Sequence, residues 1–131
     1  MRSYVPQNIL MVIPSLEMGG AQSNMLRLST EYRRQGHRVV IVDLKPTKRD
    51  GDYVESLLHP SIPIFSPPFF LSDNRGSSNS FLNKRGKCQR GILKIKPETA
   101  WLKRLIKKRG INAVHSHMYL ADLYLSKHLD V

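Results

Sequence analysis

The feature that most constrains the fold is a pair of short apolar runs separated by a segment of helical periodicity. Residues 9–13 are five consecutive apolar residues bounded by Pro6 and Pro14, and residues 38–44 are rich in β-branched side chains. Such runs are typical of buried parallel strands, which are covered on both faces. Between them, apolar residues recur every three or four positions, at Ala21, Met25, Leu28 and Tyr32. The sequence therefore predicts a strand–helix–strand unit in a parallel sheet.

The same alternation continues along the chain. The patterns predict a short helix over 52–59, a strand over 62–65 crowded by prolines, a helix from Pro97, a strand over 111–115 and a helix over 119–129. Gly36 follows the helical segment that begins at Ala21, and Gly110 follows the one that begins at Pro97. Both are positions where glycine commonly ends a helix. The fold class is predicted to be α/β, a partial Rossmann-like, doubly wound parallel sheet with helices on both faces.

We expect residues 1–131 to form one Rossmann-like domain, incomplete at its C-terminal side. Within it, residues 66–96 are rich in proline, glycine and serine, which predicts a long mobile loop. No internal repeat is visible. The apolar run of residues 9–13 is too short for a signal peptide core of about 7–15 residues or a membrane span of about 20. With a single cysteine, Cys88, these features favour a cytoplasmic location.

Positive charge is concentrated in one segment. The net charge is +11, and the segment from Lys84 to Arg109 contains eleven basic residues and a single acidic one, Glu98. Such a cluster favours an anionic partner: a lipid surface, a phosphorylated substrate or a nucleic acid. The alternative is a solvated basic face that binds no partner. Phe69, Phe70 and Phe81 add apolar side chains beside the cluster. The combination suits peripheral contact with an anionic membrane.

Candidate ligand-binding residues follow the first and fourth predicted strands. With strand order 3-2-1-4, the switch point lies between these strands, where open parallel sheets bind ligands beyond their carboxyl ends. Gly19 and Gly20 lack side chains at the start of a helix, whose free N–H groups attract phosphate. The alternative is a tight turn without a ligand. The loop matches neither G-x-G-x-x-G nor G-x-x-x-x-G-K-[ST], which weighs against a dinucleotide enzyme or a P-loop ATPase.

Two histidines end the fourth predicted strand. His115 and His117 alternate, so their side chains should share one side of the strand. We expect His115 to be a core residue and His117 to donate a hydrogen bond to a sugar hydroxyl or a phosphate. Asp122, in the next helix, is a candidate cap or ligand contact, or only a surface carboxylate. We predict no metal site, because no further ligands lie nearby in the sequence, and no nucleophile–base pair is recognisable.

Two stretches resemble the family 4 (group 1) glycosyltransferases. Residues 9–44 contain a strand, a GGAQ turn, a long helix and a G-H-R-V sequence, and residues 111–125 read INAVHSHMYLADLYL. The resemblance implies a GT-B fold, with two Rossmann-like domains around a cleft, and transfer of a sugar with retention. The N-terminal domain of the family holds mainly the acceptor, and the C-terminal domain holds most of a nucleotide-sugar donor.

The resemblance also implies roles for single residues. Gly19 and Gly20 would approach the donor diphosphate, and His117 would lie near the transferred sugar as the catalytic residue. Gln22, which stands where glutamate is commoner, Ser116 and Asp122 are candidate contacts for the acceptor or another ligand. The implied partners are a nucleotide-sugar and a glycan or lipid-linked acceptor, without a cofactor or a carboxylate-held metal. The basic segment Lys84–Arg109 would then face an anionic membrane.

The chain departs from the family in one main respect. It contains no E-x7-E segment, which in the family belongs to the donor-binding domain. It also ends before the last strands of the N-terminal domain, so we expect no transfer by this polypeptide alone, an exposed apolar face and marginal stability. Two other interpretations stay open. A nucleic-acid-binding module rests on charge alone, without a recognisable motif, so nucleic acid is not the favoured partner. The other is a non-catalytic α/β domain that binds a phosphorylated ligand.

Overall fold

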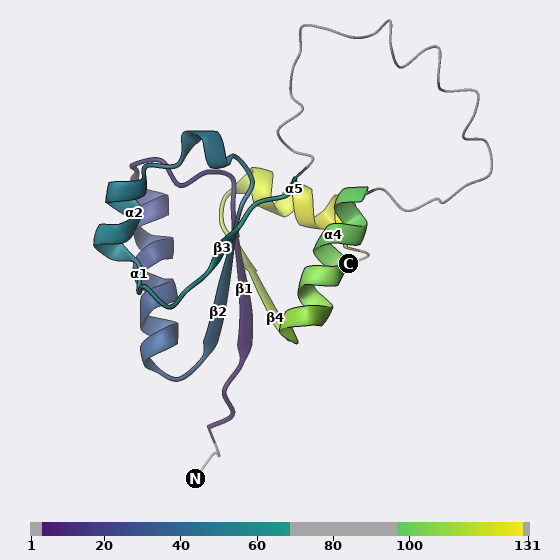
Figure 1. Cartoon of the computed structure of the whole chain (residues 1–131), viewed down its shortest axis with the longest axis horizontal. Coiled ribbons are helices and arrows are strands. Elements are labelled where there is room, and N and C mark those ends of the chain that lie inside the picture. The colour runs from purple at the N-terminus through teal and green to yellow at the C-terminus, as the bar shows by residue number, and fades with distance from the viewer. Residues whose placement is uncertain (1–3, 69–96, 130–131) are drawn as a thin grey trace, which may run out of the picture.

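A computed structural model describes residues 4–68 and 97–129 of the chain (Figure 1). The elements run β1 (Asn8–Ile13), α1 (Gly20–Arg34), β2 (Arg38–Asp43), a 3-10 turn (Pro46–Lys48), α2 (Gly51–Leu57), β3 (Ile64–Phe65), α4 (Pro97–Arg109), β4 (Ala113–Ser116) and α5 (Tyr119–His128). Most of the expected mobile loop at 66–96 lies outside the described residues, as do Phe69, Phe70 and Phe81.

The four strands form one parallel sheet in the order β3-β2-β1-β4. β1 lies at its centre, with Leu10 opposite Val40 of β2 and Val114 of β4. The predicted α/β class, the parallel pairing and the 3-2-1-4 order are confirmed. Because neighbouring strands are parallel, all their carboxyl ends reach one edge of the sheet and all their amino ends reach the other.

Two cores lie on the two faces of the sheet. Ile9, Met11 and Ile13 of β1 belong to the core under α1 and α2, whereas Leu10 and Val12 belong to the core under α4 and α5. This follows from the alternation of side chains along a strand. Figure 1 shows the two helix pairs on opposite sides of the sheet. The continuous apolar run is therefore explained by burial on both faces.

Glycines end the two long helices as the sequence predicts. Gly36 has a φ of 93° and Gly110 a φ of 60°, values that L-residues rarely adopt. After α4, the N–H of Gly110 donates to the carbonyl of Lys107 and the N–H of Ile111 to that of Ile106. The same pair of bonds closes α1 at Gly36, so both helices end in a Schellman motif.

Two strands are shorter than their sequence patterns suggest. β3 begins at Ile64 and not at Ile62, because Pro63 has no N–H to offer a neighbouring strand, although its carbonyl accepts from Ile41. β4 begins at Ala113 and not at Ile111, because the N–H of Ile111 completes the end of α4. Its last residue is Ser116, one position beyond the prediction.

Apolar side chains are exposed around β4 and α5. Val114, Leu120 and Leu123 are each 44–49% exposed, and Tyr119 is 72% exposed. β4 is an edge strand of the described sheet. The expected exposed apolar face is thus present. In the part of the chain that the structure describes, no helix combines the length and the apolar character that crossing a membrane requires.

Candidate functional site

The candidate site lies at the carboxyl edge of the sheet, where β1 and β4 end side by side. Val12 of β1 pairs with Ser116 of β4, and the N–H of His117 donates to the carbonyl of Val12 at 2.8 Å. The chain leaves β1 toward the glycine turn and leaves β4 toward α5 at this same edge (Figure 1). The structure therefore brings the two predicted segments to one edge, as the strand order requires.

The glycine turn leads directly into α1. The carbonyl of Gly19 accepts hydrogen bonds from the N–H of Ser23 at 2.9 Å and from the hydroxyl of Tyr53 at 3.0 Å. No side chain caps the N-terminus of α1, and its first turn contains no acidic residue. The partial positive charge of this helix end is therefore not neutralised within the helix. A Cβ built on Gly20 would meet nothing within 4 Å, so the backbone there is open to approach.

Gln22 packs against this turn. It is buried, and a Cβ built on Gly19 would stand 2.4 Å from its Oε1 atom. A larger residue at position 19 would have to push this amide aside. A side chain at Gly19 would therefore require the end of Gln22 to shift, whereas Gly20 has open space around it. Of the predicted ligand contacts, Gln22 belongs to the support of the glycine turn.

His117 is the most unusual polar side chain at this edge. Its Nε2 atom is buried and has no hydrogen-bond partner among the described residues. Its ring stacks on His115 with the centroids 4.5 Å apart and the planes 19° from parallel. Burial, with repulsion from His115 as a smaller cause, lowers the pKa of His117 below its usual 6.5. The imidazole is thus held in its neutral form at neutral pH, with one ring nitrogen available.

The two histidines share one side of the strand, as predicted, but His115 is only half-buried, so its assignment to the core is wrong. The strand lies at the sheet edge, where no further strand of the described chain covers it. Within residues 4–68 and 97–129, no group of three or more His, Cys, Asp or Glu side chains could hold a metal ion.

Ser116 and Asp122 meet where β4 joins α5. The hydroxyl of Ser116 donates to Oδ1 of Asp122 across the junction of β4 and α5. Asp122 is exposed and lies in the first turn of α5, where a carboxylate complements the helix dipole. The structure therefore joins two of the predicted ligand contacts into one polar pair, on the face of β4 that packs against α5.

The backbone at Met118 is strained. This residue joins His117 to α5 with a φ of 71° and a ψ of 153°, a conformation that almost only glycine adopts. Such a residue costs about 1–3 kcal/mol. Among the described residues it is the only one other than glycine with a positive φ. Strain of this kind tends to concentrate at functional sites, and here it sets the direction in which the chain leaves His117.

Sequence reasoning missed a buried ion pair at the end of β2. Asp43 is fully buried, and its carboxylate accepts from Nε of Arg49 at 2.9 Å and from the N–H of Lys45 at 3.0 Å. Arg49 also donates to Ser66 at 3.2 Å, which links β2 to the end of β3. Burial raises the pKa of Asp43, and Arg49 opposes that shift. The available signal was a carboxylate closing an apolar strand, with an arginine six residues later.

A pocket of about 550 Å³ opens at the same edge. Its walls are the loop after β1, through Glu17 and Met18, and the segment from Thr47 to Asp52 that enters α2. Because β2 and β4 lie on opposite sides of β1, this pocket stands on the other side of β1 from His117. The sequence patterns indicate a ligand site only on the β1–β4 side of this edge, so this pocket is a finding of the structure.

No protein-family model, curated protein or solved structure matches this chain.

Proposed function

We propose that this chain is the acceptor-side, N-terminal domain of a retaining glycosyltransferase of the GT-B type. The observation that carries the proposal is the buried Nε2 of His117, which has no partner among residues 4–68 and 97–129, at the same sheet edge as the N-terminus of α1, where Gly19 offers no side-chain cap. A neutral imidazole and a helix N-terminus suit the two parts of a nucleotide-sugar, its sugar hydroxyls and its diphosphate. The sequence resemblance supplies the reaction class, sugar transfer with retention.

The proposed roles follow from the chemistry of each group. The first N–H groups of α1, at Gly20 and the next residues, bind the diphosphate oxygens that become the leaving group. His117, as the catalytic residue, hydrogen-bonds a hydroxyl of the transferred sugar. Ser116 and Asp122 contact the acceptor. The remaining donor contacts belong to a second Rossmann-like domain, so this polypeptide alone does not transfer sugar.

The membrane contact expected for Lys84–Arg109 is part of the same proposal. Residues 84–96 lie outside the described structure, but Lys103, Arg104 and Lys107 are exposed on α4. Such a surface attracts anionic lipids by charge, with a contribution that salt screens. A cytoplasmic protein with a lipid-linked acceptor would sit at the inner face of the membrane. We expect salt-sensitive binding to phosphatidylglycerol vesicles, and equal binding to pure phosphatidylcholine would contradict it.

A pair of glycine substitutions tests the diphosphate site. A Cβ added at Gly20 or at Gly51 would meet no atom within 4 Å, and each glycine opens a helix, so alanine should leave the fold intact at both. We expect Gly20→Ala to weaken binding of uridine, guanosine or adenosine diphosphate about tenfold, because the new methyl group crowds the N–H groups. Gly51→Ala, in the wall of the 550 Å³ pocket, is the matched control.

Titration of each variant with the nucleoside diphosphates, followed by amide NMR shifts, measures this binding. Shifts centred on Gly20 and Ala21, lost in Gly20→Ala and kept in Gly51→Ala, support the proposal. If none of the three diphosphates binds, or if Gly51→Ala alone abolishes binding, the assignment of the diphosphate to the glycine turn is wrong. His117→Gln should leave diphosphate binding unchanged and weaken only the binding of the intact nucleotide-sugar.

A further inference from the structure

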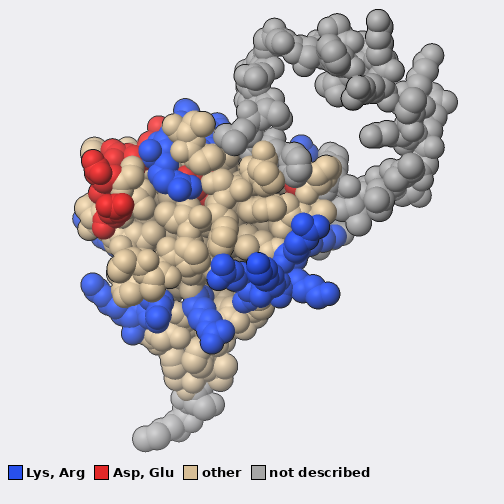
Figure 2. Space-filling model, viewed as in Figure 1, with Lys and Arg blue, Asp and Glu red and all other residues tan. Residues whose placement is uncertain are grey.

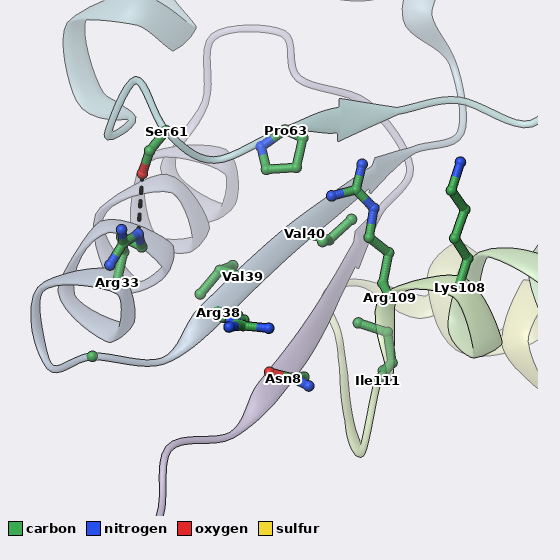
Figure 3. Close-up of a pocket in the computed structure, with 11 residues that line it drawn as sticks. Asn8, Arg33, Arg38, Val39, Val40, Ser61, Pro63, Lys108, Arg109 and Ile111 are labelled. Carbon is green, nitrogen blue, oxygen red and sulfur yellow. Dashed lines mark hydrogen bonds between the residues drawn. The ribbon is translucent and has the colours of Figure 1, made fainter.

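A second pocket lies at the opposite, amino edge of the sheet (Figure 3). Its volume is about 500 Å³, and its lining contains four basic residues and no acidic one. The four are Arg33, Arg38, Lys108 and Arg109. We infer that this pocket is a binding site for a phosphate group carried by a small ligand or a lipid headgroup. The inference does not rest on the proposed sugar transfer, because the pocket shares no residue with the glycine turn or with His117, although Lys108 and Arg109 belong to the basic segment proposed to face a membrane.

The topology explains why these residues gather. A helix that connects parallel strands runs antiparallel to them, so its C-terminus lies at the amino edge of the sheet. Arg33 closes α1, Lys108 and Arg109 close α4, and Arg38 is the first residue of β2. β3 begins only at Ile64, so it pairs with the later residues of β2 and leaves Arg38 and Val39 without a strand neighbour on that side. The short third strand therefore helps to open the pocket.

The charge of the pocket exceeds what the helices need. Cations near helix C-termini compensate the partial charge there, about −0.5 for each helix. Two helix ends thus account for about one unit against four positive charges, which leaves about three. Neither ion pair found among the described residues involves these side chains. Figure 2 shows Lys and Arg side chains across the lower half of the face in view and a further group at the upper left, where Asp and Glu also lie, near α2.

Two of the cations are held in place and two are free to bind. Nε of Arg33 donates to the hydroxyl of Ser61 at 3.1 Å. The guanidinium of Arg109 lies over the ring of Phe65, 5.0 Å from its centroid, in a cation–π contact. In contrast, Arg38 and Lys108 form no side-chain hydrogen bond or ion pair with any described residue. The fixed guanidinium groups frame the pocket, and the other two cations can close on a ligand.

Phosphate is the chemistry that this lining fits. Guanidinium groups offer paired N–H donors to phosphate oxygens, and a lysine adds a compact charge. A dianionic phosphate satisfies a residual charge of this size better than a single carboxylate does. The volume lies within the range of about 300–1,000 Å³ that is usual for small-molecule sites, so a phosphorylated solute or one lipid headgroup fits.

The test compares two charge-matched double variants of the full chain. Arg38→Gln/Lys108→Gln removes the two free cations of the pocket. Arg27→Gln/Lys127→Gln removes one exposed cation each from α1 and α5, outside both the pocket and the segment Lys84–Arg109, with the same loss of net charge. Isothermal titration with inorganic phosphate and pyrophosphate, at fixed salt, measures a soluble ligand. Flotation with phosphatidylcholine vesicles, with and without phosphatidylglycerol, measures a headgroup.

We expect the pocket variant to lose about tenfold in affinity in at least one arm, while the control changes less than about twofold. Binding in the titration alone identifies a phosphorylated solute, and binding in the vesicle arm alone identifies a headgroup. An equal loss in both variants means diffuse attraction to a basic surface, and no binding in either arm means no site. Both of these results would overturn the inference. Gly20→Ala distinguishes this pocket from the diphosphate site of α1. We expect that variant to keep the affinity measured for the pocket.

Discussion

At the scale of single residues, burial shifts the pKa values of Asp43 and His117, two side chains at the carboxyl edge of the sheet. Burial raises the pKa of Asp43 and lowers that of His117, because it disfavours the charged form of each. The two differ in their partners. Arg49 offsets the cost at Asp43 with a 2.9 Å bond, whereas Nε2 of His117 has no partner among the described residues. This difference separates a group that holds the fold together from one that is available to a ligand.

The first prediction concerns the pH dependence that His117 imposes. Its folded-state pKa lies below the unfolded value of 6.5, so between the two values the unfolded chain binds more protons. The contribution of His117 is therefore fully present above about pH 6.5 and is lost as the pH falls through the folded-state pKa. Urea denaturation at about pH 7.5 and about pH 5 should show a steeper loss for the wild type than for His117→Gln.

The same residue can be followed directly. The imidazole Hε1 resonance that is missing in His117→Gln should titrate with a pKa below 6.5. His115→Gln should move that pKa upward, because repulsion from His115 is the second cause of the shift. A His117 resonance that titrates above 6.5 would show that the ring is not buried as the structure has it.

At the scale of elements, the ends of α1 and α4 determine where β2 and β4 begin. The Schellman motifs use the N–H groups of His37 and Ile111, so β2 and β4 start only after them. This is why the apolar pattern from Ile111 onward overestimates the length of β4. The same motifs place Arg33, Lys108 and Arg109 at the amino edge, where they line the basic pocket.

The second prediction tests those helix ends. Alanine at Gly36 or Gly110 must adopt a positive φ, which costs about 1–2 kcal/mol. At Gly110 the new Cβ would also stand 3.3 Å from Nδ2 of Asn8, whereas at Gly36 its nearest neighbour is 3.9 Å away. We expect both variants to unfold at lower denaturant concentration. Gly51→Ala is the control, since Gly51 has neither a positive φ nor a close neighbour. A loss of stability in Gly51→Ala equal to that in Gly36→Ala would contradict this account.

At the scale of the whole molecule, one sheet separates two cores and two chemically different edges. The central strand β1 and its neighbour β2 each contribute residues to both cores, whereas β4 contributes only Ala113, which packs against the core under α1 and α2. The carboxyl edge carries the histidine, the glycine turn and the buried ion pair. The amino edge carries a basic pocket without acids. Cooperative stability therefore depends mainly on the packing of β1.

The third prediction compares one substitution at two depths. Leu10 is fully buried in β1, whereas Leu123 of α5 is 44% exposed. Leu10→Ala should lower the free energy of unfolding by about 2–5 kcal/mol, because it removes buried methyl groups and leaves a cavity. Leu123→Ala should change it by less than about 1 kcal/mol. Urea unfolding measures both, and a cost at Leu123 comparable to that at Leu10 would mean that the exposed α5 face is packed in solution.

Local patterns in the sequence determined much of this protein. The double-sided apolar run of β1, the helical period of α1 and the glycines at positions 36 and 110 predict the elements and their order, because each reflects a local requirement of the backbone. The 3-2-1-4 order is the one expected of a Rossmann-like sheet, and the structure confirms it. The position of Gly19, Gly20 and His117 at one edge then follows from the topology.

Only the tertiary structure decided which polar groups meet. Arg49 reaches Asp43, Ser116 reaches Asp122, and residues from α1, β2 and α4 converge on the basic pocket. The half-exposure of His115 and the missing partner of the His117 Nε2 among the described residues likewise depend on neighbours from other elements. Sequence patterns report the period of a segment and the residues that end it. Burial and pairing are set by distant residues in three dimensions, so no local pattern encodes them.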